Sequence, residues 1–362
     1  MVAISPSAWQ VFHSAWKNGG AFPGFHLAAF IVAALDWTKR RVAWQPFARF
    51  VYHLMESGKS PAVAPLVSVI VPMYNHAKYI EECLDSIRDE DWPQLELILL
   101  DDGSTDDTFA RAQAWVEKNR SHFQRVWLEK QANQGICKTV NRLIDASQGD
   151  YLALIASDDA LVRGGIRCRV EHLHQHPQHL AVFGRVELIG DDVKTLAKIQ
   201  KSHTQQERAW RRPSLLVRGL LLNWGLAGPI LLSRREAFDS GRGVGRYDGT
   251  FAYEDLDMYL RFLARNALGF VDQPVGKYRV HFSSFCRDKN RPPPKDESYR
   301  VWAKHRDRFH GLNHWLVTFQ MWKSERGLHR RPPLYCWFGR QAVSVWRKGH
   351  RFQVALRSLL PS

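Results

Sequence analysis

The sequence predicts an α/β fold that is built on a parallel sheet. Two short apolar runs, Val67–Val71 and Leu95–Leu100, are typical of strands that are buried on both faces. The segment between them places apolar residues at spacings of three and four, which predicts an amphipathic helix. These residues are Ile80, Cys83, Leu84 and Ile87. Strand, helix and strand in this order form a βαβ unit, so both strands end at the same edge of the sheet.

Adjacent acidic residues follow two of the predicted strands. Asp101 and Asp102 come directly after Leu95–Leu100. Asp158 and Asp159 follow a further apolar run, which begins at Tyr151. Adjacent carboxylates repel each other unless a cation or hydrogen-bond donors neutralise them. Hard carboxylate oxygens suit Mg²⁺ or Mn²⁺, which can also hold phosphate oxygens. Together the two pairs favour a nucleotide-phosphate site, although either pair alone is equally typical of a turn or a helix cap.

The alternation of strands and helices continues along the chain. Ser104 to Asp107 form a capping-box pattern, which predicts a helix start directly after the acidic turn. Residues 190–212 are polar and predict a long loop or lid, whereas residues 215–222 and Phe251–Arg265 are helix candidates. The other predicted helices span residues 77–90, 106–119, 136–147 and 163–175, and the predicted strands span residues 67–72, 95–101, 125–129, 150–156 and 180–188.

The net charge of +15 is confined to the two ends of the chain. Residues 1–60 carry six Lys or Arg and two Asp or Glu, residues 291–362 carry fifteen and four, and residues 61–290 carry thirty of each. A basic excess outside the core favours an anionic surface, such as a membrane or an acidic acceptor, over a nucleic-acid duplex. We therefore expect no nucleic-acid partner, and we divide the chain into an N-terminal helical extension (1–60), a central domain (61–290) and a basic, Trp-rich helical C-terminal extension (291–362).

The two extensions leave membrane contact open. Phe25–Leu35 is apolar but only about a dozen residues long, short of the roughly 20 that span a bilayer. It predicts a helix that packs on the core or on a partner, with membrane contact as the alternative. Residues 331–361 place apolar residues on one face of a helical wheel and Arg340, Arg347 and Arg351 on the other. This pattern fits an interfacial membrane helix and an ordinary docked amphipathic helix equally well.

The five cysteines are scattered, odd in number and without a CxxC pair. This pattern argues against a disulfide framework and against a zinc knuckle. It fits a reducing compartment, so we expect a cytoplasmic protein, either free or attached peripherally to the inner face of the cell membrane.

Five segments, in this order and spacing, resemble the family 2 glycosyltransferases. They are VSVIVPMYN, LELILLDDGSTDDT, QANQGICKTVN, GDYLALIASDD and YEDLDMYLR, and the resemblance extends from Leu66 to Ser284. It implies a GT-A fold, which is a Rossmann-like mixed sheet flanked by helices, with a nucleotide-binding half (61–188) and an acceptor half (189–290). It also implies an inverting, metal-dependent transfer of a sugar from a nucleoside diphosphate to an acceptor hydroxyl.

The resemblance also implies where the sugar nucleotide binds. Pro72, Tyr74 and Asn75 match the loop that cradles the base, with Tyr74 stacking on it. Asp102 matches the acid that pairs with a pyrimidine ring nitrogen, which favours UDP- or dTDP-sugars. Asp158 matches the first acid of a DxD-type pair and is expected to face the ribose.

The same resemblance implies the metal ligands and the general base. Asp159 matches the second acid of the DxD-type pair, which binds Mg²⁺ or Mn²⁺, and His281 matches a position that approaches the metal or the diphosphate in some members. Glu254 and Asp255 match the "ED" motif, in which Asp255 is the expected general base. Without the upstream motifs, the two acids would fit an ordinary helix N-terminus.

The sequence departs from the family pattern at two places. Many relatives carry a further acid at the position of Ala156, and many carry Arg before Asn141, where this chain has Val140. Lys138 lies about one helical turn from Asn141. We expect Asn141 to belong to the nucleotide-sugar site, and Lys138 is either a diphosphate ligand or a plain surface lysine.

The expected partners are a nucleoside-diphosphate sugar and a glycan or lipid-linked acceptor, with an anionic membrane surface as a further partner of the C-terminal extension. Two other functions fit parts of the sequence. A sugar nucleotidyltransferase would also use an α/β sheet with metal-binding acids, but it would need a Gly-rich phosphate loop in place of the loop that contains Tyr74. A non-catalytic protein that binds a sugar nucleotide or a membrane would explain the basic C-terminal extension and the missing acid at Ala156.

Overall fold

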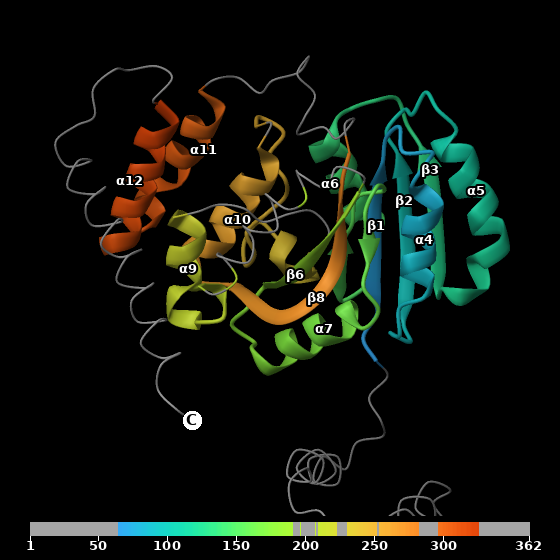
Figure 1. The fold of residues 1–362 in the computed structure, drawn as a ribbon, viewed down its shortest axis with the longest axis horizontal. Helices are drawn as coiled ribbons and strands as arrows, with labels where there is room; N and C mark the ends of the chain where they lie inside the picture. Colours follow the sequence, from blue (N-terminus) through green and yellow to red (C-terminus); the bar gives the residue numbers. More distant parts are fainter. Residues whose placement is uncertain are drawn as a thin grey trace, which may run out of the picture. The chain divides into compact units, whose positions relative to one another are not determined.

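The structure is a computed structural model that describes residues 64–190, 196, 207, 209–222, 230–251, 253–281 and 296–325. In this part of the chain, one eight-stranded mixed sheet has the strand order β3-β2-β1-β4-β7-β6-β8-β5 (Figure 1). The strands are β1 (Val67–Met73), β2 (Leu95–Asp101), β3 (Arg125–Lys130), β4 (Tyr151–Leu154), β5 (Ala160–Leu161), β6 (Ala181–Gly190), β7 (Leu231–Arg234) and β8 (Leu268–Val280). The main helices are α4 (Ile80–Arg88), α5 (Thr108–Asn119), α6 (Ile136–Ala146), α7 (Gly165–Gln175), α9 (Pro213–Leu222), α10 (Glu254–Ala264), α11 (Glu297–His305) and α12 (Gly311–Glu325).

Parallel pairing of β1 with two neighbours sets the geometry of the sheet. β1 pairs in parallel with β2, which places Met73 opposite Asp101, and it pairs in parallel with β4 on its other side. The chain segments that follow these three strands therefore leave the sheet at one edge. We call this edge, where β1, β2 and β4 end, the carboxyl edge.

Successive side chains of the central strands pack on opposite faces of the sheet. Val67, Val69 and Val71 of β1 pack with apolar residues of α4, α5 and α7, whereas Ile70 packs with residues of α6, α9 and α10. The strand is thus buried on both faces, as its uninterrupted apolar run predicts. In Figure 1, α4 and α5 lie beside β2 and β3, and α9, α11 and α12 lie toward the other end of the sheet.

The predicted α/β fold is confirmed, and each predicted strand and helix before residue 190 matches an observed element to within a few residues. Three strands were not predicted, namely β5, β7 and β8. β5 and β7 are very short, and β8 contains Asp272, Gln273, Pro274 and Lys277, so none of the three has an apolar pattern that marks a strand. The second helix starts directly after the acidic turn, as predicted, but without the side-chain hydrogen bonds of a capping box. It begins at Thr108, and the Ser104 hydroxyl instead accepts the backbone N–H of Asn75.

Several predictions fall on residues outside those described. These are the N-terminal extension with Phe25–Leu35, most of the loop at residues 190–212, and the wheel pattern of residues 331–361. No helix within the described residues has both the length and the apolar character needed to cross a membrane. The boundaries at residues 60 and 290 remain predictions.

The described part of the C-terminal extension packs on the central domain. Helices α11 and α12 contribute Val301, Trp302, Leu316 and Val317 to the core that also contains residues of α9 and α10. Gln320 adds two hydrogen bonds, because its amide nitrogen donates to the carbonyl oxygens of the last two residues of α9. Two of the tryptophans in this extension, Trp302 and Trp322, are therefore buried in the protein itself.

A buried charge network joins α11 to α10. The carboxylate of Asp257, which is fully buried, accepts hydrogen bonds from Arg261 at 2.7 Å, from Lys304 at 2.7 Å and from His305 at 2.8 Å. Burial alone would raise the pKa of Asp257, but the hydrogen bonds from His305 and Lys304 outweigh it and leave the pKa well below its usual range. Lys304 also reaches Asp248 at 2.8 Å, so one ammonium group ties α11 to the loop before α10.

Replacing Asp257 with Ala should destabilise the protein strongly. The change leaves the cationic side chains of Arg261 and Lys304 and the buried imidazole of His305 without their shared acceptor, and breaking a buried ion pair from one side costs about 3–5 kcal/mol. Chemical denaturation of the wild type and the variant measures this loss. The matched control is Asp307→Ala, whose side chain is 77% exposed and which should change the free energy of unfolding by less than about 0.5 kcal/mol. Equal stability of D257A and D307A would show that the network does not anchor α11.

Candidate functional site

Two loops at the carboxyl edge are tied to each other by hydrogen bonds. The loop after β1 contains Asn75, whose backbone is left-handed with φ of 55°. The side-chain oxygen of Asn75 accepts the backbone N–H of Thr105 at 2.8 Å, and the backbone N–H of Asn75 donates to the Ser104 hydroxyl at 2.9 Å. One residue further, the N–H of His76 donates to the Thr108 hydroxyl at 2.8 Å. The loops after β1 and β2 therefore form one rigid unit, in which Asn75 has a structural part.

The two acids after β2 organise the backbone around them. Asp101 accepts the N–H groups of Gly103 and Ser104, which closes the turn that follows the strand. Asp102 accepts the side-chain amide of Gln131 at 2.8 Å and the N–H groups of Gln134 and Gly135 at 2.8 and 2.9 Å. The expected base-pairing acid, Asp102, is thus fixed by the loop that leads into α6.

A cluster of two imidazoles and one carboxylate lies where the segments after β1, β4 and β8 meet. We call His76, Asp158 and His281 the His–Asp–His cluster. His281 Nε2 lies 2.9 Å from Asp158 Oδ2, and His76 Nε2 lies 3.7 Å from the same oxygen. One nitrogen or oxygen from each residue lies within 4.8 Å of the others, a spacing at which the three could hold a metal ion. Burial alone would raise the pKa of Asp158, but the hydrogen bond with His281 and the charge of His76 leave it lowered.

Asp159, the expected metal ligand, is not among the three residues of this cluster, and its role on the metal stays a prediction. It is 2% exposed, and its Oδ1 accepts the backbone N–H of Arg279 at 2.7 Å. Burial, followed by the charge of Asp158, raises the pKa of Asp159 well above its usual value. The physical reason for the difference is the direction of the chain after β4, because the turn that aims Asp158 at His281 aims Asp159 at the backbone of β8.

The "ED" pair lies in the first turn of α10, close to the start of α6. Burial and the neighbouring charge of Asp255 raise the pKa of Glu254 to about 7. Surrounding protein atoms also desolvate the carboxylate of Asp255 and raise its pKa, while part of the residue still reaches solvent. Cys137 of α6 lies 3.6 Å from the carbonyl oxygen of Asp248, and burial together with the charge of Glu254 raises the pKa of its thiol to about 12. These contacts make the N-terminal turns of α6 and α10 neighbours.

The remaining expected site residues have different surroundings. Pro72 is half-buried at the end of β1, and Tyr74 is 39% exposed beyond it, so the ring of Tyr74 is available for stacking. Lys138 is exposed on the first turn of α6. Asn141 is half-buried, and its side chain makes two reciprocal hydrogen bonds with the backbone of Tyr247, at 2.9 and 3.0 Å. This residue holds the loop before α10.

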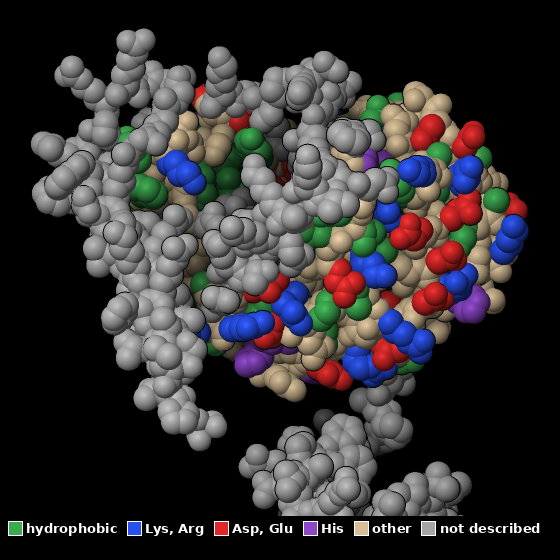
Figure 2. Space-filling model, viewed as in Figure 1, with side chains coloured by type: hydrophobic (Ala, Val, Ile, Leu, Met, Phe, Trp, Pro, Cys, Tyr) green, Lys and Arg blue, Asp and Glu red, His purple; other side chains and the backbone are tan. Residues whose placement is uncertain are grey.

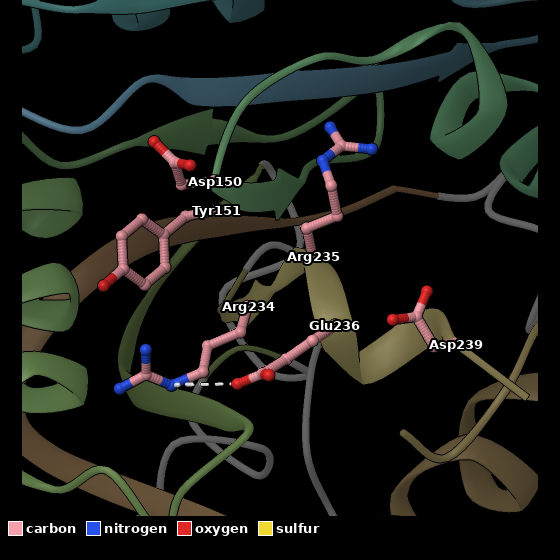
Figure 3. A pocket seen from close by; sticks show the side chains of 6 residues that line it. All are labelled: Asp150, Tyr151, Arg234, Arg235, Glu236 and Asp239. Carbon is pink, nitrogen blue, oxygen red and sulfur yellow. Dashed lines mark ion pairs between the residues drawn. The ribbon is translucent and has the colours of Figure 1, made fainter. Parts of the chain in front are cut away.

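A surface pocket lies elsewhere, around the first residues of β4 and the end of β7. Asp150, Tyr151, Arg234, Arg235 and Glu236 line it together with Asp239 (Figure 3). Both arginines are already bonded to the protein, since Arg234 donates to the His179 carbonyl and Arg235 donates to the Gly149 carbonyl. None of the expected site residues lines this pocket.

Basic and acidic side chains are interspersed on the described part of the face shown in Figure 2, over α4, α5 and α7. This agrees with the equal numbers of basic and acidic residues in the central domain. A mixed surface of this kind does not form the single-sign stripe that nucleic-acid binding uses.

Comparison with known proteins agrees with this geometry. Residues 68–240 match the family model described as Glycosyl transferase family 2. Over these residues, the chain is similar to the family 2 glycosyltransferases. The match contains β1, β2 and β4 with the loops that follow them, so it covers the carboxyl edge.

Individual relatives of this protein are distant in sequence. An uncharacterized glycosyltransferase of Rickettsia typhi is 25% identical over 235 residues, which cover 62% of this chain and 66% of that protein. A PGL/p-HBAD biosynthesis glycosyltransferase of Mycobacterium tuberculosis is 32% identical over 124 residues, which cover 34% of this chain and 47% of that protein. The crystal structure of S. aureus TarS 1-349 in complex with UDP-GlcNAc has a TM-score of 0.56 at 17% identity, covering 73% of this chain and 74% of that chain. This last likeness shows that the two proteins share a fold.

Two residues of the carboxyl edge were missed in the sequence. His76 directly follows the expected base-binding loop, and its position beside Tyr74 and Asn75 was the only available signal. Arg279 lies over the ring of Tyr79 at 4.7 Å and donates to the carbonyl of Asp158 at 2.7 Å and to Glu82 at 2.5 Å. It comes from β8, a strand that the sequence pattern did not predict.

Replacing Asn141 with Ala should loosen the loop before α10. The change removes both hydrogen bonds to Tyr247 and leaves buried backbone groups unpaired, which costs about 1–3 kcal/mol. The loss can be measured by chemical denaturation, with hydrogen exchange at residues 244–250 as the local readout. Asn133→Ala, at an exposed position, is the control. Faster exchange at the loop in N133A but not in N141A would contradict this role.

Proposed function

We propose that this protein is an inverting glycosyltransferase that moves a sugar from a nucleoside-diphosphate sugar to an acceptor hydroxyl. The observation that carries the proposal is the convergence at one carboxyl edge. Tyr74 and the His–Asp–His cluster lie on the loops of this edge. Asp102 of the same edge binds the start of α6, which in turn contacts the loop that precedes the acid pair. Acids with perturbed pKa values and clusters of possible metal ligands are both typical of catalytic sites.

The donor would lie across the loops after β1 and β2. Tyr74 would stack on the base, with Pro72 and Asn75 shaping its loop and Asp102 contacting a pyrimidine ring, which favours a UDP- or dTDP-sugar. TarS, which has the same fold, is described in complex with UDP-GlcNAc, and this fits a UDP-sugar donor. Lys138, exposed at the start of α6, would face the diphosphate.

The donor set of the His–Asp–His cluster fits a divalent cation. Asp158 and His281 would hold it, and we assign Asp158 rather than Asp159 because Asp159 is engaged by the backbone of Arg279. When bound, Mg²⁺ or Mn²⁺ supplies Lewis-acid stabilisation for the charge that develops on the leaving diphosphate. Asp159 would hold the backbone of Arg279 and so keep the cluster in register.

Asp255 would act as the general base. Its carboxylate takes the proton of the acceptor hydroxyl as that oxygen attacks the anomeric carbon, opposite the departing diphosphate, and the anomeric centre inverts. Glu254 would lie on the same side and adjust the charge around Asp255. Raised pKa values make both carboxylates stronger bases than acids with an ordinary pKa.

The acceptor is proposed to belong to surface polysaccharide, lipopolysaccharide or lipid-linked glycan synthesis. The relative from Mycobacterium tuberculosis is named for PGL/p-HBAD biosynthesis, which fits a glycan of the cell envelope. A cytoplasmic protein, attached peripherally through its basic C-terminal extension, would suit such an acceptor. Ala156, in place of a further acid, keeps a non-catalytic nucleotide-binding protein as the second candidate.

Asp255→Asn should abolish sugar transfer and leave donor binding almost unchanged. Removing a general base lowers the rate about 10²–10⁴-fold, whereas the uncharged side chain keeps the size of the site. Transfer can be followed as nucleotide release from a panel of UDP- and dTDP-sugars, and donor binding by calorimetry. Asp307→Asn, which alters a highly exposed acid outside the carboxyl edge, is the control. Full activity of D255N, or donor binding by the wild type without any transfer, would favour the second candidate.

The pH dependence of transfer should show the ionisation of the acid pair. Because burial raises the pKa of Glu254 to about 7, kcat/KM should fall as the pH falls through about 7, where Glu254 becomes protonated. In Glu254→Gln the fall should move to lower pH and follow Asp255 alone. A pH profile of E254Q that coincides with that of the wild type would remove Glu254 from the site.

A further inference from the structure

We propose that His76 is a third protein ligand of the cation and that it makes the site selective for Mn²⁺ and similar transition ions over Mg²⁺. The inference rests on the proposed metal site at Asp158 and His281. It assigns a role to a residue from the loop after β1, next to the expected base-binding residues. It also offers a substitute for the acid that is missing at Ala156.

The orientation of the His76 ring supports this role. His76 Nδ1 lies 2.8 Å from the Ser157 hydroxyl, and the opposite nitrogen, Nε2, lies 3.7 Å from Asp158 Oδ2. When Nδ1 carries the proton and donates it to Ser157, Nε2 presents a lone pair toward the carboxylate. Metal-binding histidines use the same arrangement, in which one nitrogen is held by a hydrogen bond and the other binds the ion.

The backbone holds this ring in place. The N–H of His76 donates to the Thr108 hydroxyl at 2.8 Å, and the preceding residue, Asn75, is fixed to Thr105. The three cluster side chains are 22%, 14% and 9% exposed for His76, Asp158 and His281, which leaves the cluster open on the His76 side. A ligand set on rigid loops with partial access suits an ion that must also contact a substrate.

The chemistry of the three groups determines the ion. Two imidazole nitrogens and one carboxylate oxygen form the set that is typical of transition-metal sites with open positions. Mg²⁺ prefers oxygen ligands and retains its water, so it gains little from an imidazole. Where many relatives have a carboxylate oxygen at position 156, this chain would use an imidazole nitrogen of His76 as the ligand. This exchange shifts the metal preference of the site toward Mn²⁺, Co²⁺ or Zn²⁺.

A competing explanation is that His76 only positions Ser157 and Asp158. The variant His76→Asn separates the two roles, because the shorter amide can still donate to Ser157 but has no atom at the place of Nε2. A purely positioning residue would leave the nitrogen ligands of the ion unchanged in this variant.

Mn²⁺ binding to the full chain, without any nucleotide, tests the proposal. Titration followed by electron paramagnetic resonance gives the affinity, and pulsed measurements report couplings to imidazole nitrogen. We expect two imidazole couplings in the wild type and one in H76N. We also expect the Mn²⁺ affinity to fall about 10–100-fold while the Mg²⁺ affinity, measured by competition, stays within about threefold.

Two further variants assign the signal. Asp158→Asn should remove it, and any binding that remains in D158N comes from elsewhere, for example from the adjacent rings of His172, His176 and His179. His122→Ala, at an exposed position, should behave like the wild type. Two imidazole couplings and wild-type affinity in H76N would overturn the inference.

The experiment distinguishes a failure of the ligand role of His76 from a failure of the proposed function. Sugar transfer by a wild type that shows only one imidazole coupling would overturn the ligand role of His76 and leave the enzyme proposal standing. Two couplings in a protein that transfers no sugar would do the reverse.

Discussion

The parallel pairing of β1 with both β2 and β4 is the constraint on which the site depends. The loops after the three strands contain His76, Asp102 and Asp158, which are far apart in the sequence. Parallel strands end at one edge, so the pairing brings these loops together before any ligand is present. β8 completes the edge, because it delivers Arg279 and His281 to the segment after β4. Binding energy can then be used on the ligand instead of on ordering the loops.

The acids at this edge and in α10 have different neighbours, which give each carboxylate a different electrostatic environment. Asp102 is neutralised by N–H groups and shapes a loop, whereas Asp158 faces two imidazoles and is suited to a cation. Asp257 is buried against two cationic groups and one imidazole and holds α11 to α10, while Glu254 in the same helix has its pKa raised. Within one turn of helix, the surroundings thus lower the pKa of one carboxylate and raise the pKa of another.

The sequence predicted the elements whose residues carry a strong local pattern. Val67–Val71 and Leu95–Leu100 were recognisable as buried strands because every residue contributes to the same signal. The resemblance to family 2 glycosyltransferases gave the site region and is confirmed by the family match. The division of labour between Asp158 and Asp159 was not accessible in this way, because it depends on which of two adjacent side chains the turn after β4 directs toward His281.

The parts that could not be predicted depend on contacts between distant segments. The tie between His76 and Ser157 crosses 81 positions, and its existence follows from the β1–β4 register and not from any local spacing. Helix α11 was assigned to a separate extension because of its charge, yet its Lys304 and His305 have their partner in α10. Charge counted along the sequence does not reveal which cations are buried.

The central claim is that one edge of the sheet holds the donor and its cation together. Anomalous X-ray diffraction from crystals grown with Mn²⁺ and UDP tests it most directly. The account predicts a single strong Mn²⁺ peak in contact with Asp158 and His281, with the uracil ring against Tyr74. A peak at the cluster of His172, His176 and His179, or a nucleotide bound away from the loops after β1 and β2, would contradict it.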